Sequence, residues 1–179
     1  MTEHELIEGC VHENIVFQEK FYRMFCGKML GACMRYTVSR EEAEDMLQEG
    51  FVKVFDNLKH FRHDGSLEGW VKRIIVNTAI SFYNKRKNKL IEQDIDGEGG
   101  FEPSVNEQVS CKMDVADLLK VINMLPPGYK MVFNLFAIEG YAHKEIAEIM
   151  NYSENTSKTQ YHKARNLIQK ILHERKILT

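Results

Sequence analysis

The chain has 179 residues, of which 28% are charged and 44% are hydrophobic, an ordinary composition for a soluble globular protein. Its longest apolar-rich run, VFNLFAI, is far shorter than the roughly 20 residues that cross a bilayer, and no basic segment followed by an apolar stretch opens the chain. We therefore expect a cytoplasmic protein with no direct membrane insertion.

The four cysteines, Cys10, Cys26, Cys33 and Cys111, lie far apart along the chain. This spacing favours buried free thiols over disulfides or metal ligands. A metal-dependent enzyme that uses Cys10, His12 and Cys111 is an alternative, but it lacks any close cluster of ligands in the sequence. We expect no enzymatic activity, no metal and no cofactor.

Charge is segregated along the chain, although the net charge is only −2. Residues 1–60 carry 7 basic and 11 acidic groups, and residues 61–91 carry 7 and 2. Residues 92–113 carry 1 basic and 6 acidic groups, and residues 114–179 carry 9 basic and 7 acidic groups. This alternation predicts separate small basic surfaces rather than one large one.

The acidic block predicts a linker. Residues 91–110 have no hydrophobic periodicity, contain three glycines and a proline, and lack basic residues, which is typical of a mobile segment. On either side of it, apolar residues recur at helical spacing rather than alternating. The sequence therefore predicts an all-α protein with two small helical domains, residues 1–90 and 113–179, joined by a flexible acidic linker over residues 91–112.

In the first domain, an apolar stripe predicts one long helix that faces a core. The stripe comprises Phe17, Phe21, Phe25, Met29, Ala32 and Tyr36. SREE at residues 39–42 then predicts a capping box, in which Ser39 accepts a backbone N–H and Glu42 reaches back. One side of the helix that follows is apolar, with Ala43, Met46, Leu47, Phe51, Val54, Phe55 and Leu58. On spacing alone, its other side is a solvated acidic face with Asp45, Gln48, Glu49, Lys53 and Asp56.

After a turn at residues 61–65, Ser66 is expected to cap a third helix. Its apolar side comprises Leu67, Trp70, Val71, Ile74, Thr78 and Phe82. Its other side carries Arg73, Asn77, Ser81 and Asn84, flanked by Lys72 and by KRKNK at residues 85–89, with no acid from residue 71 to 91. Because Asn is a mediocre helix former, Asn77 suggests a surface chosen for hydrogen bonding. The pattern leaves two interpretations open, a nucleic-acid surface or an ordinary basic face.

The sequence of the second domain predicts a helix-turn-helix. Pro126 and Pro127 end one helix and suit the first turn of the next, which Gly140 closes. In the short helix at residues 143–150 that follows, Ile146, Ala147 and Met150 face inward. Asn151 is expected to adopt the left-handed cap, and Ser153 caps a last helix. That helix buries Tyr161, Ala164, Leu167, Ile168 and Ile171.

The last helix contains nineteen residues, Asn155 to His173, without a single acid. Its exposed side presents Asn155, Lys158, Thr159, His162, Lys163, Asn166 and Gln169, beside Arg165. A carboxylate in a DNA major groove would meet phosphate oxygens, so the missing acids favour a DNA-reading helix. The alternative is a pair of packed helices from any small bundle.

Three segments in order resemble the extracytoplasmic-function sigma factors of bacterial RNA polymerase. AEDMLQEGFVKVF resembles the family's polymerase-binding helix, and WVKRIIVNTAISFYNKRK resembles its promoter-melting and minus-ten-reading helix. The segment from LPPGYK at residue 125 to HKAR at residue 165 resembles its minus-thirty-five reader. The resemblance covers nearly the whole chain and implies promoter-specific transcription initiation, with reading of both elements and help in melting DNA.

The resemblance implies roles for individual residues. Contacts to the clamp helices of the polymerase's largest subunit fall to Asp45, Gln48 and Glu49. Minus-ten recognition falls to Lys72, Arg73 and Asn77, and to the loop from Phe61 to Ser66, including Arg62, that captures a base flipped from the non-template strand. Minus-thirty-five recognition falls to Asn155, Lys158, Thr159, His162, Lys163 and Arg165.

The implied partners are core RNA polymerase, through its clamp helices and flap region, promoter DNA, and an anti-sigma factor. The acidic linker resembles the family segment that passes through the RNA exit path. Gln160 stands where the family commonly has a basic residue and Asn155 where it often has Gly, so the base preference cannot be transferred from other members. An autonomous helix-turn-helix regulator is the alternative function, but it leaves the face with Asp45, Gln48 and Glu49 unexplained.

Overall fold

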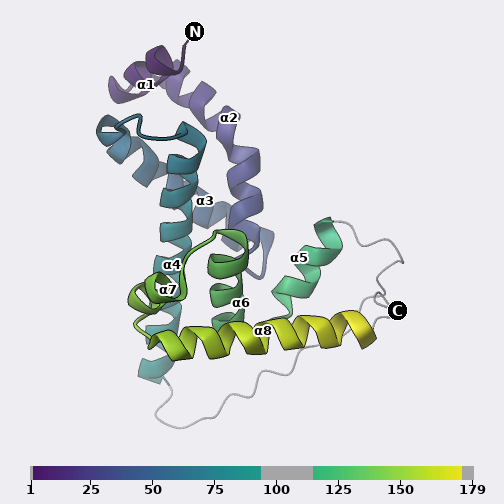
Figure 1. Ribbon diagram of the computed structural model, residues 1–179. Coiled ribbons are helices and arrows are strands. Elements are labelled where there is room, and N and C mark those ends of the chain that lie inside the picture. The colour runs from purple at the N-terminus through teal and green to yellow at the C-terminus, as the bar shows by residue number, and fades with distance from the viewer. Residues whose placement is uncertain (1, 94–114, 175–179) are drawn as a thin grey trace. The chain divides into compact units, whose positions relative to one another are not determined.

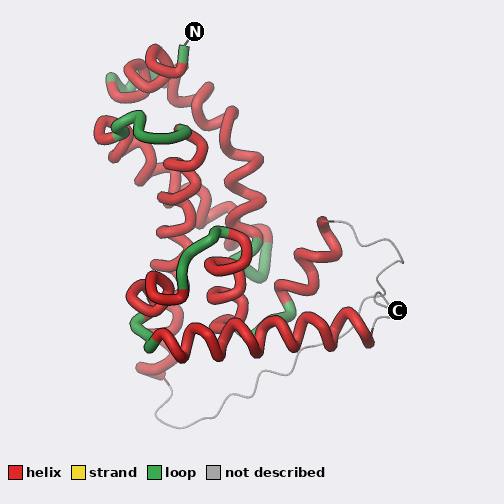
Figure 2. The backbone as a smooth tube through the Cα atoms, in the orientation of Figure 1, coloured by secondary structure: helices red, strands yellow, loops and turns green. Residues whose placement is uncertain are grey.

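The computed structural model describes residues 2–93 and 115–174, and every regular element in these ranges is helical, as predicted (Figures 1 and 2). The chain divides into two compact units, Met1–Phe82 and Tyr83–Thr179. The described helix α4 continues to Gln93, three residues into the predicted linker, and the rest of the linker lies outside the described residues. Within the described ranges, no helix is both long and apolar enough to span a membrane.

The first unit contains four helices and a short 3-10 turn: α1 (Glu3–Val11), α2 (Ile15–Met34), α3 (Arg40–Asn57), η1 (Leu58–His60) and the first part of α4 (Leu67–Gln93). Their apolar sides share one core around Phe21, Met29, Leu47 and Val71. The apolar lines predicted for α2 and α3 lie in or against this core, apart from Ala32, which is buried but is not part of this cluster. Tyr36 differs slightly, because α2 ends at Met34 and Tyr36 packs from the turn that follows.

Helix α1 was not predicted. Thr2 Oγ1 accepts the Glu5 N–H at 3.2 Å, while Glu5 Oε2 accepts the Thr2 N–H at 2.8 Å, so the helix begins with a capping box. Leu6, Ile7 and Cys10 are buried on its inner side. The sequence TEHE at residues 2–5 matches the capping-box pattern. Three apolar positions in nine residues, however, gave too little periodicity to predict a helix from the sequence.

Helix α3 begins where SREE predicts. Ser39 Oγ accepts the Glu42 N–H at 3.1 Å, and Glu42 Oε2 accepts the Val38 N–H at 3.2 Å, one residue before the N-cap. Near the middle of α3, Gly50 is buried against the Ile75 side chain of α4. The absence of a Cβ at Gly50 therefore allows the two helices to approach closely.

The second unit contains α5 (Val115–Asn123), α6 (Pro127–Phe133), the π-helical turn η2 (Asn134–Ile138), α7 (His143–Met150) and α8 (Glu154–Glu174). Its core includes Val121 of α5, Leu125 of the turn that follows α5, and Ala164 and Ile168 of α8. Gly140, with φ of 77°, ends the α6–η2 segment, as predicted.

The turn between α7 and α8 has the predicted geometry. Asn151 is left-handed, with φ of 54°, and the next amide, of Tyr152, donates to the Ala147 carbonyl at 2.9 Å. Ser153 Oγ accepts the Thr156 N–H at 3.0 Å and caps α8. Helices α7 and α8 therefore form the predicted helix-turn-helix.

Candidate functional surfaces

The outward side of α3 presents the three residues predicted to bind polymerase. Asp45 and Gln48 are exposed, and Glu49 is partly buried. Glu49 Oε1 lies 2.6 Å from Lys53 Nζ, which also donates to Thr78 Oγ1 of α4 at 3.5 Å. Lys53 thus fixes the Glu49 carboxylate and ties α3 to α4. The sequence pattern predicted Lys53 on this face but no role for it, although Glu and Lys four residues apart are a recognised helical pair.

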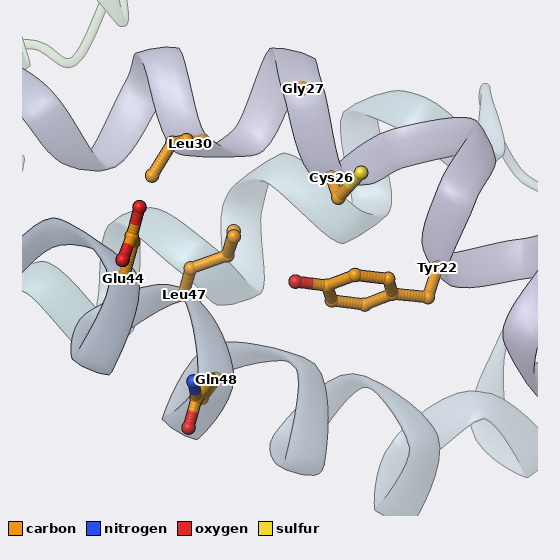
Figure 3. Close-up of a pocket in the computed structure, with 7 residues that line it drawn as sticks. All are labelled: Tyr22, Cys26, Gly27, Leu30, Glu44, Leu47 and Gln48. Carbon is orange, nitrogen blue, oxygen red and sulfur yellow. The ribbon is translucent and has the colours of Figure 1, made fainter.

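A cavity of about 280 Å³ opens beside this face, between α2 and α3 (Figure 3). The residues that line it are Tyr22, Cys26, Gly27, Leu30, Glu44, Leu47 and Gln48. Gln48 belongs to both the cavity wall and the outward face of α3. Burial raises the pKa of Tyr22, with smaller contributions from Cys26 and Glu44, so its hydroxyl is protonated at neutral pH.

The loop from Phe61 to Ser66 follows η1 and leads into α4. Phe61 is partly buried, with its ring 5.4 Å from that of Trp70, and Arg62 is exposed. Ser66 is exposed, and its hydroxyl accepts the Gly69 N–H at 3.1 Å, which caps α4 as predicted. An aromatic ring, a cation and a hydroxyl thus lie on one short segment, and proteins bind single-stranded nucleic acids through aromatic and cationic side chains.

On α4, Arg73 and Asn77 are exposed one turn apart, and Lys72 is partly buried. Of the predicted inner side, Leu67, Val71 and Thr78 are buried, whereas Trp70, Ile74 and Phe82 are partly buried. Four further residues that were not predicted to face inward are also buried: Ile75, Val76, Ala79 and Ile80.

On α8, every residue predicted to read the major groove is exposed: Asn155, Lys158, Thr159, His162, Lys163 and Arg165. Two of them have partners on the same helix. Lys158 Nζ lies 2.6 Å from Glu154 Oε1, and His162 Nε2 lies 3.0 Å from Asn166 Nδ2. The hydrogen bond and charge of Lys158 lower the pKa of Glu154, so this carboxylate is ionised at the N-terminal end of α8.

His143 of α7 supports this face from behind, a role that the sequence did not suggest. Its ring stacks on Phe136 at 4.1 Å between centroids, and Nδ1 lies 3.0 Å from the buried Ser157 hydroxyl of α8. Burial lowers the pKa of His143, and the charge of Lys158 lowers it further. The neutral imidazole therefore holds α7 against α8 near neutral pH.

The cysteines within the described ranges are free thiols, as predicted: Cys10 and Cys33 are buried and Cys26 is partly buried, while Cys111 lies outside these ranges. Burial raises the pKa of Cys10 to about 11 and that of Cys33 to about 12, so both remain protonated thiols. Among residues 2–93 and 115–174, no three His, Cys, Asp or Glu side chains gather as a potential metal site.

Two small helical domains, the second a helix-turn-helix whose outer helix carries no acid from Asn155 to His173, indicate a nucleic-acid-binding protein. The family model for Sigma-70 region 2 matches residues 21–89, and the model for Sigma-70 region 4 matches residues 116–168. The chain belongs to the extracytoplasmic-function sigma factors, the family to which its motifs are similar.

Similar proteins include the ECF RNA polymerase sigma-E factor of Haemophilus influenzae, 29% identical over 79% of this chain and 80% of that protein. The ECF RNA polymerase sigma factor SigW of Bacillus subtilis is 26% identical over 89% of this chain and 86% of that protein. Among solved structures, the sigma factor RpoE in complex with the anti-sigma factor NepR from Bartonella quintana matches with a TM-score of 0.54. At 22% identity over 87% of this chain and 96% of that chain, this match supports the fold.

Proposed function

We propose that this chain binds core RNA polymerase through Asp45, Gln48 and Glu49 and directs it to promoters that carry two elements. The loop from Phe61 to Ser66, with Lys72, Arg73 and Asn77, reads and opens the minus-ten element. The exposed side of α8 reads the minus-thirty-five element in the major groove. The protein works in the cytoplasm without catalysing a reaction of its own.

The observation that carries this proposal is the α8 surface. Six polar or cationic side chains predicted to read DNA are all exposed on one helix. The left-handed backbone at Asn151 and the Ser153 cap fix where that helix begins after the turn. A helix-turn-helix places the N-terminal residues of its second helix against base edges. Each good side-chain pairing there discriminates between bases by about 1–3 kcal/mol.

Neither DNA surface is large, so we infer that promoter binding depends on polymerase. Docking on a shared scaffold turns the second contact into an intramolecular one and raises the effective affinity without any new contact. The isolated chain should therefore bind promoter DNA weakly. An anti-sigma factor, the kind of partner present in the RpoE structure, would inhibit this chain by covering the same surfaces.

The test is to reconstitute the full chain with core polymerase on fragmented genomic DNA and to map the transcript starts. We expect starts downstream of two shared sequence elements, and loss of these starts in the variant Asp45→Ala/Gln48→Ala/Glu49→Ala. Tight, sequence-specific gel shifts by the chain alone, with no polymerase complex, would instead identify an autonomous regulator.

A further inference from the structure

Helix α1 contacts the loop from Phe61 to Ser66, which the proposed function assigns to base capture. His63 Nδ1 lies 3.9 Å from Glu3 Oε1 of α1. The His63 ring is stacked with His4, also of α1, with 6.3 Å between centroids and 12° between planes. These two residues face the loop from the start of α1.

His63 also contacts the ring that the loop would present to a base. Its ring meets Phe61 edge-on at 4.6 Å between centroids, and Phe61 lies 5.4 Å from Trp70 of α4. His63 therefore stands between α1 on one side and Phe61 on the other. A change in the position of His63 would remove this edge-on contact from the Phe61 ring.

The backbone at His63 is left-handed, with φ of 57°. This conformation is uncommon for residues other than glycine and persists where surrounding contacts hold it. The contacts with Glu3, His4 and Phe61 supply such support.

Helix α1 is itself firmly placed. Leu6, Ile7 and Cys10 are buried in the core of the first unit, which they share with Leu58 of η1. Gly9 contacts the Phe17 ring so closely that a Cβ would not fit. Because η1 leads directly into the loop, α1 supports the loop at its base and at His63.

We propose that α1 is a positioning element for the base-capturing loop, and that His63 sets how strictly the loop selects the base it takes from single-stranded DNA. This inference rests on the proposed function of the loop. It assigns a role in promoter selectivity to Glu3 and His4, which lie outside the segments that resemble the family's DNA-reading motifs. Stacking of a base on an aromatic side chain tolerates any base, so selectivity requires that the ring and its polar neighbours be held in one arrangement.

The test uses full-length chain in complex with core polymerase and, as probe, a single-stranded DNA library with a random central window. Bound molecules are sequenced, and base preference is scored separately from total binding. His63→Asn keeps a residue that tolerates a left-handed backbone but removes the ring. We expect it to lower the base preference at one position by about fivefold, the lower end of the discrimination between bases that one well-placed side-chain contact gives. His4→Ala should also lower the preference, and His4→Phe, which restores a ring, should recover it.

Glu13→Asn is the matched control, because Glu13 is also left-handed, with φ of 56°, and lies in the turn between α1 and α2. It should leave the preference unchanged. Full base preference in both His63→Asn and His4→Ala would overturn the inference, and so would reduced total binding with the preference intact. If the unmodified complex does not form or selects no base, the proposed function itself fails.

Discussion

Lys158 and Glu154 form an ion pair one turn apart on α8, with 2.6 Å between Nζ and Oε1. Glu154 is the residue just before the acid-free run, so one carboxylate stands at the end of the helix proposed to enter the major groove. The Glu154 carboxylate neutralises the charge of Lys158 and would repel the phosphates of the DNA backbone. We expect Glu154→Gln to strengthen binding of the isolated chain to duplex DNA of any sequence by about two- to fivefold at low salt. Fluorescence anisotropy would measure the change.

Glu174→Gln provides the control, since Glu174 lies 3.8 Å from Lys170 near the other end of the described part of α8. It should alter affinity much less. Weaker binding by Glu154→Gln would indicate that the carboxylate serves to orient Lys158.

The lowered pKa of His143 predicts that the stability of the helix-turn-helix depends on pH. Burial, aided by Lys158, lowers its folded pKa below the unfolded value, so the unfolded chain binds more protons as the pH falls. Stability is therefore fully present above the unfolded pKa of about 6.5 and declines as the pH drops through the folded pKa. The protection factors of the α7 and α8 amides, which are corrected for the intrinsic pH dependence of exchange, should therefore fall between neutral and acidic pH.

In His143→Asn, protection of α7 and α8 should be lower at neutral pH and should change less with pH. Amides of α2 and α3 in the same chain provide the internal reference. Equal pH slopes in the two proteins would contradict the role given to His143.

The sequence was sufficient for features that depend on local chemistry. Ser39, Ser66, Ser153, Asn151 and Gly140 mark helix ends through hydrogen bonds and backbone preferences that act within a few residues, and each does so in the structure. Helical periodicity likewise placed the apolar sides of α2, α3 and α8.

Features that depend on contacts between distant segments could not be predicted. The packing of His143 on Phe136 and Ser157, the bridge from Lys53 to Thr78, and the contact of His63 with α1 each join separate elements. No spacing rule relates such positions. The same holds for the burial of Ile75, which depends on Gly50 of another helix.

Asn151 offers a direct test of the turn. Its left-handed backbone is costly for a residue with a Cβ and no local hydrogen-bonding group, so Asn151→Ala should lower the free energy of unfolding of the second unit by about 1–2 kcal/mol. Asn151→Gly should stay within about 0.5 kcal/mol of the unmodified protein, because glycine adopts this conformation freely. Hydrogen exchange of α7 amides measures both. A large loss with glycine would contradict the backbone explanation.

Asp45 and Glu49 should contribute unequally to polymerase binding. Lys53 already pairs with Glu49, whereas Asp45 is more exposed. We expect Asp45→Asn to weaken binding to core polymerase by about tenfold and Glu49→Gln by about threefold, since a charge with an existing partner has less to gain from a new one. Competition against unmodified chain for core polymerase gives the ratio. A larger loss of polymerase binding for Glu49→Gln than for Asp45→Asn would contradict this explanation.

The close packing at Gly50 predicts that the same Gly→Ala substitution has opposite effects on stability at Gly50 and at Gly31. A Cβ at Gly50 would overlap the buried Ile75 side chain, so Gly50→Ala should lower the free energy of unfolding by about 1–3 kcal/mol. Gly31→Ala is the matched control, because α2 leaves open space there. The same substitution at Gly31 should raise stability by about 0.5–1 kcal/mol through helix propensity. Fluorescence of Trp70, the chain's single tryptophan, reports unfolding of the first unit in urea. If both variants gained stability, the close approach of α3 and α4 at this point would be refuted.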